Sequence, residues 1–192
     1  MPATTCPMTE THRDRFLADG FTRVDDMIAP DELDHVREVY DRLFADAADE
    51  DLKHLGGKDD QGRDVLPQIL GAHEKAPELL ETDYFQRCEQ VARLIFGNDV
   101  KFRGGHMILK PAEYGSPTPW HQDQAYHDPN YFYRNVNFWL PLQDATIESG
   151  CMQFVRRSHL GPVVPHTFLN DDPNAATVAQ DQNYWTANAT PV

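Results

Sequence analysis

Apolar residues recur at three- and four-residue intervals in two segments of the N-terminal half, a spacing typical of amphipathic helices. The first segment covers residues 30–47 and opens with a proline followed by two carboxylates, which favour a helix start. The second covers residues 77–96, and Gly97-Asn98 after it is a common helix end. Both helices are therefore predicted to pack one face against the core.

The remaining N-terminal chain is predicted to be less regular. Residues 1–10 read as a loose tail, and a short helix over residues 11–19 is followed by a brief strand over residues 21–24. Residues 46–64 are dense in Asp, Gly and Lys, which predicts a solvated loop.

From residue 100 onward the apolar period changes to two, which indicates short strands separated by Gly, Pro and Asn/Asp turns. The predicted strands cover residues 101–110, 120–125, 135–142, 151–156 and 163–167, with a bulge at Gly104-Gly105 in the first. Residues 170–192 are polar and are predicted to form a tail. The pattern predicts an α+β fold: one domain over residues 1–192, helical over about 11–98 and stranded over about 100–192.

Composition narrows the function classes. The net charge is −14 with no basic stripe, which argues against nucleic acid and anionic membranes as partners. Three cysteines without Cys-x-x-Cys spacing favour a reducing compartment, and the N-terminus has no signal-peptide pattern, so a cytoplasmic location is expected. A small-molecule substrate is the expected partner, and the oligomeric state is left open.

His121-Gln122-Asp123 is the candidate metal site. On a strand, side chains at positions i and i+2 share a face, so an imidazole and a carboxylate at this spacing can hold one ion. With 9 His and 21 Asp in the chain, about one such pair is expected by chance, and His12-Arg13-Asp14 is a second match. That second pair lies in a predicted helix, where positions i and i+2 diverge, so we interpret it as surface.

Longer stretches resemble the phytanoyl-CoA dioxygenase family. Residues 16–44, 107–126 (MILKPAEYGSPTPWHQDQAY), 137–154 (NFWLPLQDATIESGCMQF) and 157–166 (RSHLGPVVPH) are similar to its N-terminal helix and central strands. The ordered set Lys-Pro, Trp-His-x-Asp, Trp-x-Pro-Leu, Ser-Gly-Cys and Ser-His is the most specific part of the resemblance.

The resemblance implies a non-haem Fe(II), 2-oxoglutarate-dependent dioxygenase that uses O₂ to hydroxylate an unactivated C–H bond. It also implies a double-stranded β-helix, or jelly roll, with the N-terminal helices packed outside it. His121 and Asp123 would be iron ligands, Lys110 would reach the dianionic 2-oxoglutarate, and Trp139 would lie beside it. Asn137, Tyr126 and His106 are candidate substrate contacts, with an ordinary hydrogen-bonded strand histidine as the alternative for His106.

The chain departs from the family pattern downstream. Arg156-Arg157 replace the usual Pro-Gly before Ser158-His159, and no histidine follows His166. The family's third iron-ligating histidine and its 2-oxoglutarate-binding arginine are therefore not found, and about five predicted strands fall short of a jelly roll's eight. We expect the sequence to be an N-terminal fragment, with His159 or His166 as substitute third ligands the less favoured explanation.

Three other interpretations stay open. The chain could be an inactive jelly-roll module that binds a small molecule or protein, a cupin-type metalloenzyme without 2-oxoglutarate, or a truncated chain without function. Ligand binding that does not depend on iron would indicate the binding module. Oxygen uptake without cosubstrate would indicate the cupin-type enzyme, and loss of a cooperative melt would indicate the truncated chain.

Overall fold

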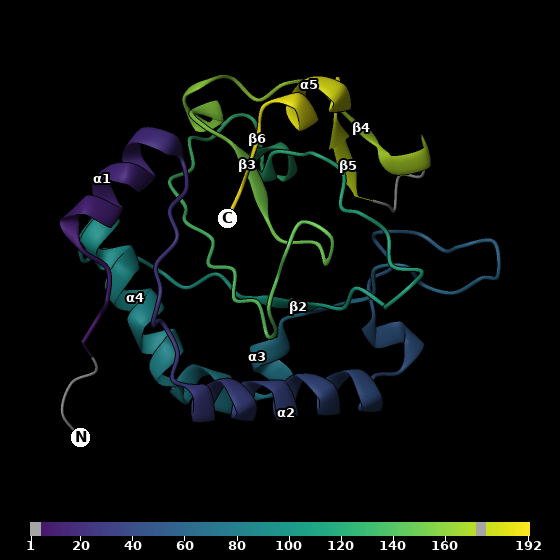
Figure 1. Cartoon of the computed structure of the whole chain (residues 1–192), viewed down its shortest axis with the longest axis horizontal. Helices are drawn as coiled ribbons and strands as arrows, with labels where there is room; N and C mark the ends of the chain where they lie inside the picture. Colours follow the sequence, from purple (N-terminus) through teal and green to yellow (C-terminus); the bar gives the residue numbers. More distant parts are fainter. Residues whose placement is uncertain (1–4, 172–175) are drawn as a thin grey trace.

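The structure is a computed structural model that describes residues 5–171 and 176–192. The helices are α1 (Glu10–Asp19), α2 (Pro30–Asp46), α3 (Ala72–Lys75), α4 (Asp83–Phe96) and α5 (Gln182–Ala187). The 3₁₀ turns are η1 (Asp49–Asp51), η2 (Pro77–Glu81), η3 (Asp123–Tyr126), η4 (Ser158–Leu160) and η5 (Leu169–Asp171). The strands are β1 (Gln68–Leu70), β2 (His106–Ile108), β3 (Gln153–Val155), β4 (His166–Phe168), β5 (Thr177–Ala179) and β6 (Ala189–Pro191). Helices α1, α4 and α2 curve around one side of the molecule, and β3 to β6 lie across from α2 (Figure 1).

The six strands form three antiparallel pairs, β1 with β2, β3 with β6, and β4 with β5. In the first pair Leu70 lies opposite His106 and Gln68 opposite Ile108, so these four side chains share one face of the ribbon. The chain thus has mixed helix and strand content, and within the residues described the pairs do not join into one sheet. The jelly roll stays a prediction.

The helix predictions are largely confirmed. α1 ends at Gly20, whose φ of 91° is the left-handed conformation that glycine adopts readily, and α2 begins at Pro30 as expected. The helix predicted over residues 77–96 is split, because Thr82 is extended and its hydroxyl accepts a hydrogen bond from the Phe85 N–H. Thr82 therefore starts α4 afresh after the η2 turn.

The strand predictions were too long. Only residues 106–108 of the segment 101–110 form a strand, and residues 21–24 form none, although Phe21 stacks on Phe154 with ring centroids 4.8 Å apart. Residues 135–142 alternate in sequence, but the adjacent Phe138 and Trp139 are both exposed, and no backbone hydrogen bond joins the segment to a neighbouring strand in the described chain. An alternating pattern indicates burial on one face, whereas a strand also needs a partner for its ladder.

The predicted polar tail was wrong. Within residues 170–192, β5 pairs with β4, β6 pairs with β3, and α5 lies between them, at the top of Figure 1. Main-chain hydrogen bonds hold such short strands, so polar side chains concealed them from the apolar pattern. The loop over residues 46–64 is also partly ordered, by bridges from Lys53 to Gln68 and from Lys58 to Asp64. Residues 1–4 and 172–175 of the two predicted tails lie outside the described residues.

The helical layer carries the main apolar cluster. Met8, Val91 and Ile95 are buried there, and residues from the N-terminal segment, α1 and α4 pack around them. Asp19 at the end of α1 accepts hydrogen bonds from the Arg156 guanidinium at 2.8 and 2.9 Å, which attaches this layer to the end of β3. No helix among the residues described is long and apolar enough to cross a membrane.

Candidate metal site

Trp120 is fixed in place by the C-terminal helix. The Trp120 N–H donates to Gln182 Oε1 at 2.8 Å, and Gln182 Nε2 donates back to the Trp120 carbonyl at 2.9 Å. The indole Nε1 of Trp120 donates to Thr186 Oγ1 at 3.0 Å. The Trp120 carbonyl also accepts from the Ala179 N–H at 2.8 Å, which among the described residues is the one main-chain bond between this residue and β5. A single main-chain bond makes no ladder, and the prediction of a strand over residues 120–125 was wrong.

Gln122, between the two candidate ligands, is held by hydrogen bonds with residues 162–166. Its Oε1 accepts from the Val164 N–H at 2.8 Å, and its Nε2 donates to the Pro162 carbonyl at 3.4 Å. The Gln122 N–H donates to His166 Nε2 at 3.0 Å, while His166 Nδ1 donates to the Val164 carbonyl at 2.7 Å. His166 is therefore the neutral Nδ1–H tautomer. We call these contacts of Gln122 with residues 162–166 the Gln122 anchor.

His121 and Asp123 are brought together as the spacing predicted, although Asp123 opens the η3 turn rather than continuing a strand. His121 Nε2 lies 3.3 Å from Asp123 Oδ1, and His121 Nδ1 donates to the Pro119 carbonyl at 2.9 Å. Asn137 Nδ2 donates to the other carboxylate oxygen, Asp123 Oδ2. His121 Nε2 and Asp123 Oδ1 therefore face one another. The other ring nitrogen of His121 and the other carboxylate oxygen of Asp123 are each held by a hydrogen bond.

The electrostatics of the pair suit a cation. The hydrogen bond to Asp123 raises the pKa of His121, and the same bond, with smaller contributions from Asn137 and the charge of His106, lowers the pKa of Asp123. A proton held between Nε2 and Oδ1 occupies the place that a metal ion would take, so metal binding would release it. A histidine whose Nδ1–H is bound to a carbonyl is the form in which imidazole ligates metals. The two side chains fit two ligand positions of Fe(II).

The third ligand is not supplied by the two histidines considered for it. His166 Nε2 accepts the Gln122 N–H, and His159 Nε2 bonds to the Leu17 carbonyl at 3.1 Å, on α1. Across residues 5–171 and 176–192, no group of three or more His, Cys, Asp or Glu side chains is arranged to hold a metal. The described chain therefore offers a two-residue site.

Lys110 and Trp139, the expected 2-oxoglutarate contacts, are placed less firmly. Lys110 packs over Gly150, where an added Cβ would lie 3.4 Å from Nζ. Its side chain stays exposed along part of its length, yet partial burial lowers the pKa of the ammonium. Trp139 is 45% exposed. Among the residues described, no hydrogen bond or ring contact joins either side chain to His121 or Asp123, so their roles stay predictions.

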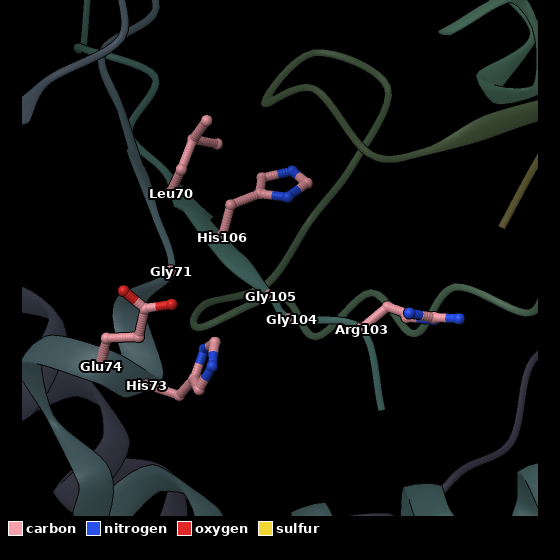
Figure 2. A pocket seen from close by; sticks show the side chains of 8 residues that line it. All are labelled: Leu70, Gly71, His73, Glu74, Arg103, Gly104, Gly105 and His106. Atoms are coloured by element: carbon pink, nitrogen blue, oxygen red, sulfur yellow. The ribbon is translucent and has the colours of Figure 1, made fainter. Parts of the chain in front are cut away.

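The three candidate substrate contacts lie around the pair in different ways. The Tyr126 ring is edge-on to His121 with centroids 6.2 Å apart, and its hydroxyl accepts from the Thr177 N–H at 3.1 Å. Asn137 is bound to Asp123, as described above. His106 projects from β2 at the wall of a pocket (Figure 2).

Sequence reasoning missed the supports of the site. Gln182 and His166 lie 62 and 44 residues from their partners Trp120 and Gln122. A glutamine in a polar segment carries no local signal for such a contact.

The chain was compared with known proteins. Residues 16–192 match the family described as phytanoyl-CoA dioxygenase (PhyH). Crystal structures of EvdO2 from Micromonospora carbonacea var. aurantiaca are similar, at 34% identity and a TM-score of 0.77, covering 96% of this chain and 76% of that one. The EvdO2 structure complexed with 2-oxoglutarate gives 33% identity, a TM-score of 0.76 and the same coverage. A search of curated protein sequences gave no match. The Trp-His-x-Asp segment lies within the matched residues, and the chain belongs to the phytanoyl-CoA dioxygenase family.

Proposed function

We propose that this protein is a non-haem Fe(II), 2-oxoglutarate-dependent dioxygenase that hydroxylates an unactivated C–H bond of a small organic substrate. The observation that carries the proposal is the pairing of His121 Nε2 with Asp123 Oδ1 at 3.3 Å. The other polar atoms of the two side chains, His121 Nδ1 and Asp123 Oδ2, are already hydrogen-bonded within the protein. Family membership and the 2-oxoglutarate complex of EvdO2 support the choice of cosubstrate. Double-stranded β-helix packing around the pair belongs to the same proposal.

Each residue has a part in this proposal. His121 Nε2 and Asp123 Oδ1 would hold Fe(II), while Asn137 keeps Asp123 Oδ2 occupied and so favours one-oxygen ligation. When bound, the iron supplies O₂ activation coupled to decarboxylation of 2-oxoglutarate to succinate and CO₂, with one oxygen atom entering the substrate. The ammonium of Lys110 attracts the cosubstrate dianion, which a surface of net charge −14 otherwise repels. Trp139 offers an aromatic wall beside it.

The test is succinate formation from 2-oxoglutarate with Fe(II), ascorbate and O₂. His121→Ala should abolish turnover and also remove binding of Co(II), a spectroscopic substitute for Fe(II), measured by visible absorption. His12→Ala is the matched control, because it changes the other His-x-Asp pair of the chain, which lies on α1. An unchanged rate in His121→Ala would refute the proposal.

A second candidate is a binding module without catalysis, and the observation that favours it is the lack of a three-residue ligand set among the described residues. The two candidates differ in their need for metal. Titration calorimetry with 2-oxoglutarate in EDTA would show unchanged affinity for a binding module, together with no succinate in the iron assay.

A further inference from the structure

A pocket of about 370 Å³ lies at the end of the β1–β2 ribbon. Its walls are two short loops around Gly71 and Gly104-Gly105, together with side chains from α3 and β2 (Figure 2). This volume lies in the range of small-molecule sites.

The floor of the pocket is bare main chain. The Gly71 N–H donates to the Gly105 carbonyl at 3.0 Å, which holds the two loops together. A Cβ added to Gly105 would meet nothing within 4 Å, and one added to Gly104 would meet only His73 Cε1, at 3.7 Å. A ligand can therefore approach the backbone closely at this floor.

The rim of the pocket is charged at both ends. Figure 2 shows Glu74 and His73 at one end and Arg103 at the other, with the Gly104-Gly105 backbone between them. Among the described residues, neither the Glu74 carboxylate nor the Arg103 guanidinium has a hydrogen-bond or ion-pair partner, and His73 Nδ1 is buried without one. Elsewhere in the chain Arg63 and Arg93 are each paired with a carboxylate.

One residue of the pocket wall has an electrostatic link to the candidate metal pair. His106 lines the pocket, and its charge makes a small contribution to the lowered pKa of Asp123. Leu70 lies opposite His106 on the same ribbon face and is 48% exposed, so one apolar side chain joins the polar wall. A molecule lying over the glycine floor would have His106 and Leu70 beside it.

We infer that this pocket binds a small zwitterionic molecule, whose anionic group pairs with Arg103 and whose ammonium group pairs with Glu74, and that this molecule is the oxygenase substrate. The inference rests on the proposed function only in its last part. A long acyl chain would leave both the Arg103 guanidinium and the Glu74 carboxylate without partners, which is costly when water is displaced.

Matched probes test the charge requirement directly. The probes are 4-aminobutyrate, 6-aminohexanoate and 8-aminooctanoate, each compared with the alkanoate and the alkylamine of the same length. Titration calorimetry on the full chain should show at least one zwitterion binding about tenfold more tightly than both of its singly charged counterparts. Zwitterions that bind no better than the alkanoates would overturn the inference.

Two substitutions assign the ends. Arg103→Gln should weaken zwitterion and alkanoate binding about tenfold and leave the alkylamine unchanged. Glu74→Gln should weaken zwitterion and alkylamine binding about tenfold and leave the alkanoate unchanged. Gly105→Val should abolish binding of every probe, because its side chain would fill open space. Arg15→Gln is the control: it removes the same charge from an exposed position on α1 and should change no affinity. Equal losses in Arg103→Gln and Arg15→Gln would mean that only net charge matters, which refutes the site.

The same samples separate this inference from the proposed function. Succinate formation without a probe tests the oxygenase, and probe affinity in EDTA tests the pocket. Turnover without selective probe binding refutes the pocket alone. Selective probe binding without turnover refutes the oxygenase and, with it, the substrate role, while the zwitterion site stands.

Discussion

Removing the Gln122 side chain should destabilise the protein measurably. In Gln122→Ala the Val164 N–H loses its 2.8 Å acceptor in a half-buried position, and the weaker 3.4 Å bond to the Pro162 carbonyl is lost as well. An unsatisfied buried donor costs about 1–3 kcal/mol, so we expect a loss of about 2 kcal/mol in the free energy of unfolding. For a chain of this length that corresponds to about 4–8 °C in Tm. Urea unfolding followed by tryptophan fluorescence is the assay, since Trp120 and Trp185 lie nearby.

Two comparison variants show whether the hydrogen bonds are responsible. Gln122→Met keeps the length of the side chain but neither polar group, and should be as unstable as Gln122→Ala. Gln124→Ala removes a half-buried glutamine whose side chain has no hydrogen-bond partner among the described residues, and should cost less than about 1 kcal/mol. If Gln122→Met regained the stability of the parent protein, packing would explain the loss and the argument for the anchor would be wrong.

Three further perturbations have expected outcomes. Burial raises the pKa of Cys88 to about 12 from an ordinary 9.0, so its thiol stabilises the fold below pH 9. That stability is lost as pH rises from about 9 to about 12. The free energy of unfolding, measured by urea denaturation, should therefore fall less steeply across this range for Cys88→Ala than for the parent protein. Arg156→Ala leaves Asp19, whose side chain is 14% exposed, without its partner, and hydrogen exchange of α1 should accelerate while Arg156→Lys recovers part of the protection. Gly104→Ala should lower Tm because φ at that position is +114°, whereas Gly105→Ala should leave Tm within about 1 °C; equal effects would refute the backbone reasoning.

The helical half of the fold could be predicted from sequence because its signals are local. Pro30 at the start of α2 and Gly20 at the end of α1 act within one turn of the chain, and the apolar repeat of α4 defines its buried face. The pairing of His121 with Asp123 was predictable for the same reason, since only Gln122 separates them. The expected strand geometry was wrong, and yet the extended Gln122 backbone still directs both side chains to one side.

The strand half could not be predicted to the same degree, because its contacts are distant in sequence. β6 pairs with β3 across more than thirty residues, and the Thr and Gln side chains of the C-terminal segment carry no apolar period. Residues 135–142 show the opposite case, in which a clear alternating pattern has no ladder partner in the described chain. Asn137 within that segment donates its amide to Asp123, a contact that the sequence pattern did not indicate, and its expected contact with substrate stays a prediction.

The supports of the candidate metal site also set the order in which it can form during synthesis. Trp120 depends on Gln182, 62 residues later, and Gln122 depends on Val164 and His166, 42 and 44 residues later. At about 5–20 residues per second, the ribosome makes both ligands several seconds before it makes the residues that orient them. The growing chain thus passes through an interval in which His121 and Asp123 are present without a fixed geometry. Iron binding by the proposed pair would then be a late event, coupled to the arrival of the C-terminal strands rather than to the synthesis of His121 and Asp123.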